Sequence, residues 1–211
     1  RTLYMISDDA KTMKFEIMRT DSMNFAQGGT SSVEITFPPM QLSDEEGNPN
    51  HSSIVTYSAN TGKTVNIKDA YKEKGFDFTG AKTFDKNSGY RTTSVISVPL
   101  KNHENDIVGV MQLINATDEK SGKVVAFSAD MQQQVESLAS QGAVALTNKR
   151  LVKELKTLFE SFIQLIATAI DRKSEYTGGH CERVPDITMM LAEAVENTTE
   201  GTYKDFSMTK D

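Results

Sequence analysis

A strand pair in the middle of the chain decides the fold class. Its two halves read Ser94-Val95-Ile96-Ser97-Val98-Pro99-Leu100 and Ile107-Val108-Gly109-Val110-Met111-Gln112-Leu113. Apolar side chains recur at every second residue, which indicates strands because successive strand side chains point to opposite faces. The polar connector 102–106 consists of turn-forming residues. The two segments therefore predict an antiparallel hairpin, and His103 at its tip is expected to be a solvated turn residue.

The chain before this hairpin repeats the same two-residue period. Three strands are predicted before Pro38, around Leu3 and Met5, over 13–17 and over 33–37. Ser52 or Ser53 can cap a short helix that ends at Gly62, and a brief strand follows over 65–67. The polar stretch 68–91 is expected to be a mobile segment over a pocket, or alternatively a plain connecting loop. This half of the chain is thus predicted to be a sheet with helices beside it.

A helix of some forty-five residues is expected after Ser128, which is a suitable N-cap. Its apolar residues are spaced alternately by four and three, which is the heptad pattern of a coiled coil. A second helix must cover such a stripe, so we expect a parallel homodimer in which Asn148 fixes the register. The alternative is antiparallel pairing with the final helix over 183–195 of the same chain. The expected dimer seam is Val144, Asn148, Leu151, Leu155, Leu158, Phe162 and Leu165, continued by Ala169.

Composition excludes several classes of function. The net charge of −6 and the lack of a basic stripe argue against nucleic acid as a partner. The longest nearly apolar run, 162–170, is too short to span a bilayer, and no signal peptide is visible, so we expect no membrane segment. The single cysteine, Cys181, cannot form an intramolecular disulfide, which fits a cytoplasmic protein. His51, His103 and His180 lack metal-ligand spacing.

Three segments resemble the GAF family: 59–67, 89–100 and 107–115. They read Ala-Asn-Thr-Gly-Lys-Thr-Val-Asn-Ile, Gly-Tyr-Arg-Thr-Thr-Ser-Val-Ile-Ser-Val-Pro-Leu and Ile-Val-Gly-Val-Met-Gln-Leu-Ile-Asn. The resemblance implies an α+β fold, with a six-stranded antiparallel sheet flanked by helices and a pocket for a small molecule or a cyclic nucleotide. The helix that usually precedes the first strand is not found. Candidate ligand-binding residues are Tyr57, Tyr90, Thr92, Ser94 and Asn115, the alternative being that they make ordinary strand and loop hydrogen bonds.

The cyclic-nucleotide branch of that family carries an Asn-Lys, Phe and Asp-Glu signature, which this chain matches only in part. Asn115 and Phe127 stand in place, whereas Ala116 replaces the lysine. Met131 and Gln132 fall where the two acidic residues would be. The lost lysine and acid could have formed a charge-assisted pair beneath the pocket. Their loss weakens the prediction of a cyclic nucleotide, and the identity of the ligand stays open.

The segment 169–184 resembles the opening of the HD-GYP branch of HD phosphohydrolases. It reads Ala-Ile-Asp-Arg-Lys-Ser-Glu-Tyr-Thr-Gly-Gly-His-Cys-Glu-Arg-Val. The resemblance implies that His180 is a metal ligand in the intact protein, in an iron or manganese centre that hydrolyses cyclic di-GMP or a related phosphodiester. The other ligand motifs do not occur before Asp211, and one imidazole cannot hold such a centre. We therefore expect no catalytic residue and no cofactor in this chain.

Together these features predict a bacterial-type sensor and relay protein. The expected division is a GAF-like sensor over 1–127, a signalling and dimerisation helix over 128–173, and a truncated start of an HD-type domain over 174–211. A small ligand would shift the packing of the helix and so reach the output domain. One alternative is a GAF domain that binds no ligand and serves as a dimerisation scaffold. A second, a methionine-sulfoxide reductase, is disfavoured because no cysteine precedes Cys181.

Overall fold

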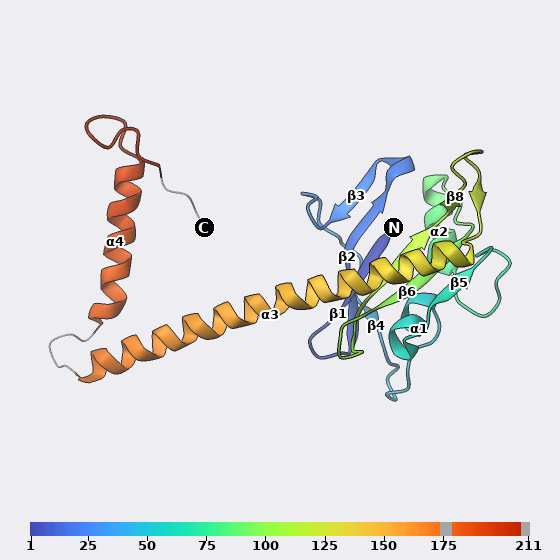
Figure 1. Ribbon diagram of the computed structural model, residues 1–211, viewed down its shortest axis with the longest axis horizontal. Coiled ribbons are helices and arrows are strands. Elements are labelled where there is room, and N and C mark those ends of the chain that lie inside the picture. Colours follow the sequence, from blue (N-terminus) through green and yellow to red (C-terminus); the bar gives the residue numbers. More distant parts are fainter. Residues whose placement is uncertain (174–178, 208–211) are drawn as a thin grey trace. The chain divides into compact units, whose positions relative to one another are not determined.

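The computed structural model describes residues 1–173 and 179–207. The chain divides into two compact units, Arg1–Lys149 and Arg150–Asp211. The first contains a sheet and its covering helices, and the second contains helical segments (Figure 1). The residues 174–178 and 208–211, which include part of the HD-GYP-like segment, lie outside the described part of the chain.

The first unit is built on an antiparallel sheet whose strands follow the order β3-β2-β1-β7-β6-β5 (Figure 1). The short strand β4 pairs with β2 off this path, and β8 pairs with β9 in a separate ribbon. The strands are β1 (Thr2–Ile6), β2 (Thr12–Thr20), β3 (Phe25–Gly28), β4 (Met40–Gln41), β5 (Val65–Ile67), β6 (Val95–Lys101), β7 (Ile107–Ile114), β8 (Ala116–Thr117) and β9 (Val124–Val125). A short 3₁₀ turn, η1 (Asp21–Met23), connects β2 with β3.

The predicted central hairpin is confirmed as β6 and β7. Ile96 lies opposite Leu113, and Val98 lies opposite Met111. The Asn102 N–H donates to the Asp106 carbonyl at 3.0 Å, which closes the turn between the strands. Every residue of β6 except Lys101 is buried, so this strand forms the centre of the unit.

Helices cover both faces of the sheet. On one face, Val95 and Val110 pack with α1 (Ile54–Thr61) and with Phe78, which immediately precedes α2 (Thr79–Ser88). On the other face, Ile96, Val98 and Leu100 pack against the first turns of α3 (Ala129–Lys173). The near-continuous burial of β6 follows from this double cover.

The helix starts follow the capping residues found in the sequence. Ser53 Oγ accepts from the Thr56 N–H at 3.1 Å, and Thr56 Oγ1 accepts from the Ser53 N–H, so the two residues form a capping box at α1. Gly62 ends α1 in the left-handed conformation at φ 65°. Ser128 Oγ likewise accepts from the Met131 N–H at the start of α3. The predicted starts of both helices are confirmed.

Two sequence predictions are wrong in this unit. The segment 33–37 is not a strand, and the third strand of the sheet is instead β3. Val33 and Phe37 are about half exposed. The alternating pattern therefore lies on a segment at the surface, where Phe37 contacts Phe15 from outside the sheet. The stretch 68–91, expected to be a loop, contains α2, whose ten residues end at Gly89 in the left-handed conformation.

One close contact between backbones shapes the middle of the sheet. A Cβ at Gly109 would lie 2.2 Å from the Tyr4 carbonyl oxygen on β1. No side chain can be accommodated at that distance, so β1 and β7 approach each other at a position that only glycine permits.

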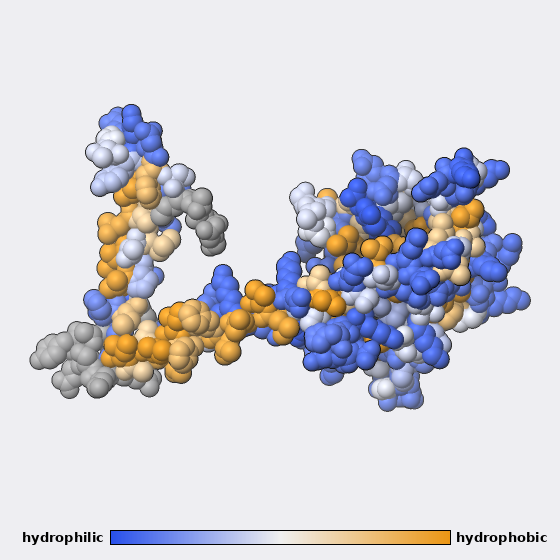
Figure 2. All heavy atoms as spheres, in the orientation of Figure 1, coloured by the Kyte–Doolittle hydropathy of each residue, from blue (hydrophilic) through white to orange (hydrophobic). Residues whose placement is uncertain are grey.

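The long helix α3 has forty-five residues, as expected. The last helix, α4 (His180–Glu196), begins three residues before the predicted start at Arg183. Large apolar side chains beyond Arg150 are mostly exposed, and they give this part of α3 its hydrophobic colour in Figure 2. Within the described ranges, no helix combines the length and the apolar character needed to cross a membrane.

Candidate functional site

A cavity of about 640 Å³ lies where β7 ends. Two of the predicted ligand-binding residues, Tyr90 and Asn115, line it. Its apolar wall comes from β7 and from Phe127, two residues before α3, and its polar rim comes from the β2 end of the sheet. The lining consists of Arg1, Arg19, Thr20, Asp21, Ser22, Tyr90, Leu113, Ile114, Asn115, Ala116, Thr117, Gly122, Val124 and Phe127. Such a volume suits a small organic ligand.

Asn115 joins the ends of the two central strands. Its Oδ1 accepts from the Thr93 N–H at 2.7 Å, and its Nδ2 donates to the Arg91 carbonyl at 2.7 Å. The residue has φ 55°, a left-handed conformation that asparagine tolerates better than most residues. Ser94 is fully buried, and its Oγ accepts from the Ala116 N–H at 3.1 Å. Both predicted ligand residues therefore also hold the strand ends together.

Thr92 takes part in a buried network around a carboxylate that the sequence analysis missed. Asp85 on α2 is only 4% exposed. Its carboxylate accepts from the Thr92 N–H at 2.7 Å, from Thr92 Oγ1 at 2.9 Å and from the Tyr71 hydroxyl at 3.0 Å. Burial with these three donors gives the charge the partners that a buried carboxylate needs. The network fixes α2 to the segment that leads into β6.

Two cationic side chains lie over the ring of Tyr71. The Arg91 guanidinium lies 4.2 Å from the ring centroid and the Lys82 ammonium 5.5 Å from it, both within cation–π range. Desolvation, together with the hydrogen bond to Asp85, raises the pKa of the Tyr71 hydroxyl, so this group stays a donor at neutral pH. A buried acid and two basic side chains thus meet around Tyr71. No signal in the sequence singled out Asp85, because a lone aspartate on a polar stretch resembles any solvated one.

Tyr57, the fifth predicted ligand residue, lies apart from the cavity. It is half-buried on α1, with its ring 5.4 Å from Phe76 and 5.2 Å from His51. It packs on the α1 and α2 face of the sheet. The five candidate residues thus fall into three groups. Tyr90 and Asn115 line the cavity, Thr92 and Ser94 are buried, and Tyr57 lies on α1.

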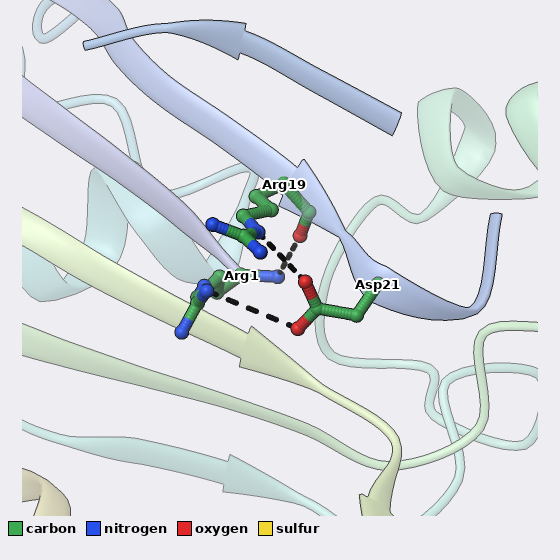
Figure 3. Close-up of polar contacts among 3 residues, drawn as sticks. All are labelled: Arg1, Arg19 and Asp21. Atoms are coloured by element: carbon green, nitrogen blue, oxygen red, sulfur yellow. Dashed lines mark hydrogen bonds and ion pairs between the residues drawn. The ribbon is translucent and has the colours of Figure 1, made fainter. Parts of the chain in front are cut away.

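Charged side chains form the rim of the cavity at the β2 end (Figure 3). Arg19 Nε lies 2.7 Å from Asp21 Oδ1, and an Arg1 nitrogen lies 3.8 Å from Asp21 Oδ2. The Arg19 hydrogen bond, aided by the charges of both arginines, lowers the pKa of Asp21. All three side chains are more than half exposed, so the guanidinium groups of Arg1 and Arg19 remain accessible to an anionic ligand.

At Gln132, one position of the incomplete cyclic-nucleotide signature, this chain forms a neutral hydrogen bond. Asn66 Nδ2 donates to Gln132 Oε1 at 3.0 Å and to the Phe127 carbonyl at 3.2 Å. Gln132 belongs to the first turn of α3, and Phe127 lines the cavity. Edge strand β5, the cavity wall and the start of α3 are therefore connected through one amide, without a charge pair.

The predicted dimer seam lies on exposed surface in both units. In the first unit, Val144 and Asn148 are exposed, whereas the neighbouring Ala143 is fully buried against the sheet. In the second unit, the seam residues from Leu151 to Leu165 are between 52% and 67% exposed. The seam is thus available for pairing in the described chain.

His180 stands exposed at the first position of α4. In the described ranges, no three His, Cys, Asp or Glu side chains come together in a way that could hold a metal. The neighbouring Cys181 N–H donates to the Asp171 carboxylate at 3.3 Å, and this acid raises the pKa of the Cys181 thiol. A raised thiol pKa disfavours a reactive thiolate. The residues present therefore do not fit an iron or manganese centre, nor a Cys–His pair.

Comparison with known proteins identifies the fold. The family model for the GAF domain matches residues 16–146. This chain belongs to the GAF family. The expected α+β class, with an antiparallel sheet flanked by helices, is thereby confirmed, and membership supports a regulatory role in signalling.

Two relatives match stretches of different length in this chain. The chain is 30% identical over 142 residues to a dual 3',5'-cyclic-AMP and -GMP phosphodiesterase 11A of Takifugu rubripes. It is 40% identical over 60 residues to a cGMP-specific 3',5'-cyclic phosphodiesterase of Drosophila melanogaster. The alignments take in 67% and 28% of this chain, but only 15% and 5% of those proteins.

Among solved structures, a GAF domain from an Acinetobacter phosphoenolpyruvate-protein phosphotransferase matches with a TM-score of 0.42 at 16% identity. That match covers 70% of this chain and 71% of the other. A type II free methionine-R-sulfoxide reductase from Thermoplasma acidophilum matches with a TM-score of 0.39 at 15% identity, over 67% of this chain and 74% of the other.

Proposed function

We propose that this chain is the sensory and relay region of a signal-transduction protein. Its GAF domain binds a small molecule, and a dimeric helix passes the binding event to an output domain. The observation that carries the proposal is the cavity at the end of β7, which combines polar side chains, basic groups and apolar walls in a GAF domain. The relatives named as cyclic-nucleotide phosphodiesterases support the regulatory role.

The ligand class follows from the chemistry of the two polar regions. Arg19 and Arg1 supply cations at the rim of the cavity, and Tyr90 supplies a ring. Arg91 and Lys82 supply further cations beside Tyr71. Guanidinium groups favour phosphate oxygens, and aromatic rings favour planar bases. A cyclic nucleotide or another anionic small molecule with a ring fits these side chains better than a neutral aliphatic one.

The relay requires that ligand binding favour one arrangement of α3 over another. The Asn66 side chain supplies a route, because it bonds both the cavity wall at Phe127 and the first turn of α3 at Gln132. Pairing of two α3 helices along the seam, with Asn148 setting the register, would carry the change along the helix.

The output domain of the intact protein is proposed to be an HD-type phosphohydrolase that acts on cyclic di-GMP or a related phosphodiester. The segment 169–184 supports this proposal through its likeness to the start of that domain. His180 would then become a metal ligand only together with His and Asp side chains from further chain. The activity would belong to that metal centre, and the GAF domain would regulate it from a cytoplasmic location.

Ligand binding is tested by isothermal titration of the protein with cAMP, cGMP and cyclic di-GMP, each checked by thermal shift. We expect one of them, or a related anionic nucleotide, to bind and to raise the melting temperature. Tyr90→Ala should weaken that binding roughly tenfold through loss of one ring contact. Thr83→Ala, an exposed change on α2, is the control. If the whole panel leaves the melting temperature unchanged, the scaffold that binds no ligand is the better description.

The relay helix is tested by sedimentation of the Leu155→Asp, Phe162→Asp double variant. Two carboxylates in an apolar seam should convert a dimer into monomers. The matched control is Lys153→Asp, Glu160→Lys, which changes charges on the opposite side of the same helix. A double variant that sediments like the parent would rule out pairing along this seam.

A further inference from the structure

The apolar face of α3 becomes wider beyond Lys156. Next to the seam runs a second row of large side chains, which we call the flank stripe: Phe159, Ile163, Ile166 and Ile170. Its members are spaced by four, three and four residues, and they are 62%, 51%, 43% and 55% exposed. Lys156 occupies the preceding position of the same row, so the stripe begins at Phe159. Seam and flank stripe together cover about four of every seven positions.

A two-stranded coiled coil covers only the seam. Helices with three or four apolar positions per heptad belong to bundles, in which each helix has more than one neighbour. The opposite side of α3 is polar over the same span and carries Thr157, Glu160 and Gln164. The apolar face is therefore broad but bounded, as a bundle helix requires. Pairing of two α3 helices alone would leave the flank stripe in water.

The final helix carries a matching row. Val184, Ile187, Leu191 and Ala194 on α4 are spaced by three, four and three residues, and the first three are 44%, 55% and 64% exposed. The flank stripe spans about 18 Å and the α4 row about 16 Å at 1.5 Å per residue. The two rows therefore match in length.

The connection between the helices sets their direction. α3 ends at Lys173 and α4 begins at His180, and a link this short favours antiparallel neighbours. Asp171 on the last turn of α3 accepts from the Cys181 N–H on the first turn of α4, which holds the two ends together. Ile170 lies three residues before the end of α3, and Val184 lies four residues after the start of α4. An antiparallel pair thus brings the rows into register.

We propose that the second unit forms a four-helix bundle with a second copy of this chain, made of two α3 and two α4 helices. Each α4 packs antiparallel on the flank stripe of its own α3, and the two α3 helices meet along the seam. A single α3–α4 pair would leave the seam from Leu151 to Phe162 exposed, so the second copy is needed to complete the core. The inference rests on the proposed dimer, which it extends from two helices to four.

The test compares apolar-to-acid changes inside and outside the predicted core. Leu191→Asp on the α4 row and Ile163→Asp on the flank stripe should each raise the dimer dissociation constant roughly a hundredfold. Each should also abolish hydrogen-exchange protection over α4. Met189→Asp, on the other side of α4, and Thr157→Asp, on the polar side of α3, are the controls and should change the constant by less than about threefold. Sedimentation equilibrium and exchange mass spectrometry measure both effects.

The outcomes separate this inference from the proposal on which it rests. If Leu191→Asp and Ile163→Asp dimerise like the parent and leave α4 exchange unchanged, while the seam variant is monomeric, the four-helix bundle is wrong and the two-stranded dimer stands. A parent chain that is monomeric at all concentrations would overturn both. As a second measurement, Ile166→Cys with Ile187→Cys in a Cys181→Ser background should oxidise within one chain. A disulfide between chains would contradict the packing of α4 on its own α3.

Discussion

The two halves of α3 have the same secondary structure and a similar supply of apolar residues, yet only the first half is covered. Val135, Ala139 and Ala143 are at most 8% exposed because they pack on β6, where small side chains allow close approach. Leu155 and Leu158 in the second half are 66% and 67% exposed. Helix formation therefore does not distinguish the halves. The difference lies in whether the sheet supplies a surface to pack against.

The largest effect is expected where the covered half meets the sheet. Ala139→Asp would place a carboxylate against β6 at a fully buried position without a partner. We expect a loss of about 4 kcal/mol or more in the free energy of unfolding. Leu138→Asp, at a neighbouring residue that is 60% exposed, is the control and should cost under about 1 kcal/mol. Equal losses in denaturant unfolding would contradict the assigned packing face of α3.

The second prediction concerns the buried acid on α2. Asp85→Asn replaces an acceptor of three hydrogen bonds by a group that presents donors of its own, at a site that is 4% exposed. The expected loss is about 2 kcal/mol, with faster hydrogen exchange in α2. Lys86→Ala on the exposed side of the same helix should leave both unchanged. The second unit, which begins at Arg150, shares none of these contacts. Its helical content should therefore be the same in both variants.

A smaller effect is expected at the start of α1. Ser53→Ala removes the side chain that accepts from the Thr56 N–H and should cost about 1 kcal/mol. Ser52→Ala, whose hydroxyl donates to Asn50 in the preceding loop, serves as the control. Chemical denaturation that ranks Ser52→Ala above Ser53→Ala would mean that the cap is not the stabilising contact.

The smallest effects are expected from carboxylates at or near the surface, and these also distinguish the two units. Hydrogen-bond donors lower the pKa of six aspartates from the ordinary 3.8, and all six lie in the first unit: Asp9, Asp21, Asp44, Asp69, Asp77 and Asp118. A lowered pKa in the folded state contributes stability above the unfolded value, and this stability is lost as pH falls through the folded pKa. The first unit should therefore become less stable as pH falls below about 4.

Thermal unfolding followed between pH 3 and pH 6 checks this dependence. Asp118→Asn, which removes the titratable charge that accepts from the Ser121 N–H and hydroxyl, should make the decline shallower by a small amount. Glu119→Gln is the reference variant, because no such bond to this neighbouring acid is found in the described chain. Its slope of melting temperature against pH is compared with that of Asp118→Asn. A melting temperature that rises between pH 4 and pH 3 would have the wrong sign for the proposed contacts.

The elements that the sequence predicted correctly are those whose signals are local. The alternation in β6 and β7 coincides with a strand pair in which β6 is buried and β7 is mostly half-buried. Ser53 and Ser128 have the short side chains that cap helices. The long helix was predictable because its periodicity runs over many turns. The seam was visible as spacing alone, and its pairing stays a prediction.

Other elements depend on tertiary contacts that spacing does not record. The segment 33–37 alternates like a strand, but β3 takes the edge of the sheet beside β2. β4, β8 and β9 have two residues each, which is too short for any periodicity. The role of Asp85 depends on α2, which places its carboxylate within hydrogen-bond distance of Thr92. At the site, Tyr90 and Asn115 were predicted and line the cavity, whereas Arg19 came from a distant strand end that no motif marked.

The narrow spacing of β1 and β7 at Gly109 bears on how this domain can be engineered. A methyl group at that position would force β1 and β7 apart, so a redesigned version must keep the glycine whatever else is replaced. By contrast, a Cβ at Gly47 or Gly122 would meet no atom within 4 Å. Because Gly122 lines the cavity, the turn at Gly47 is the place at which a reporter peptide could be inserted to follow the domain in a living cell.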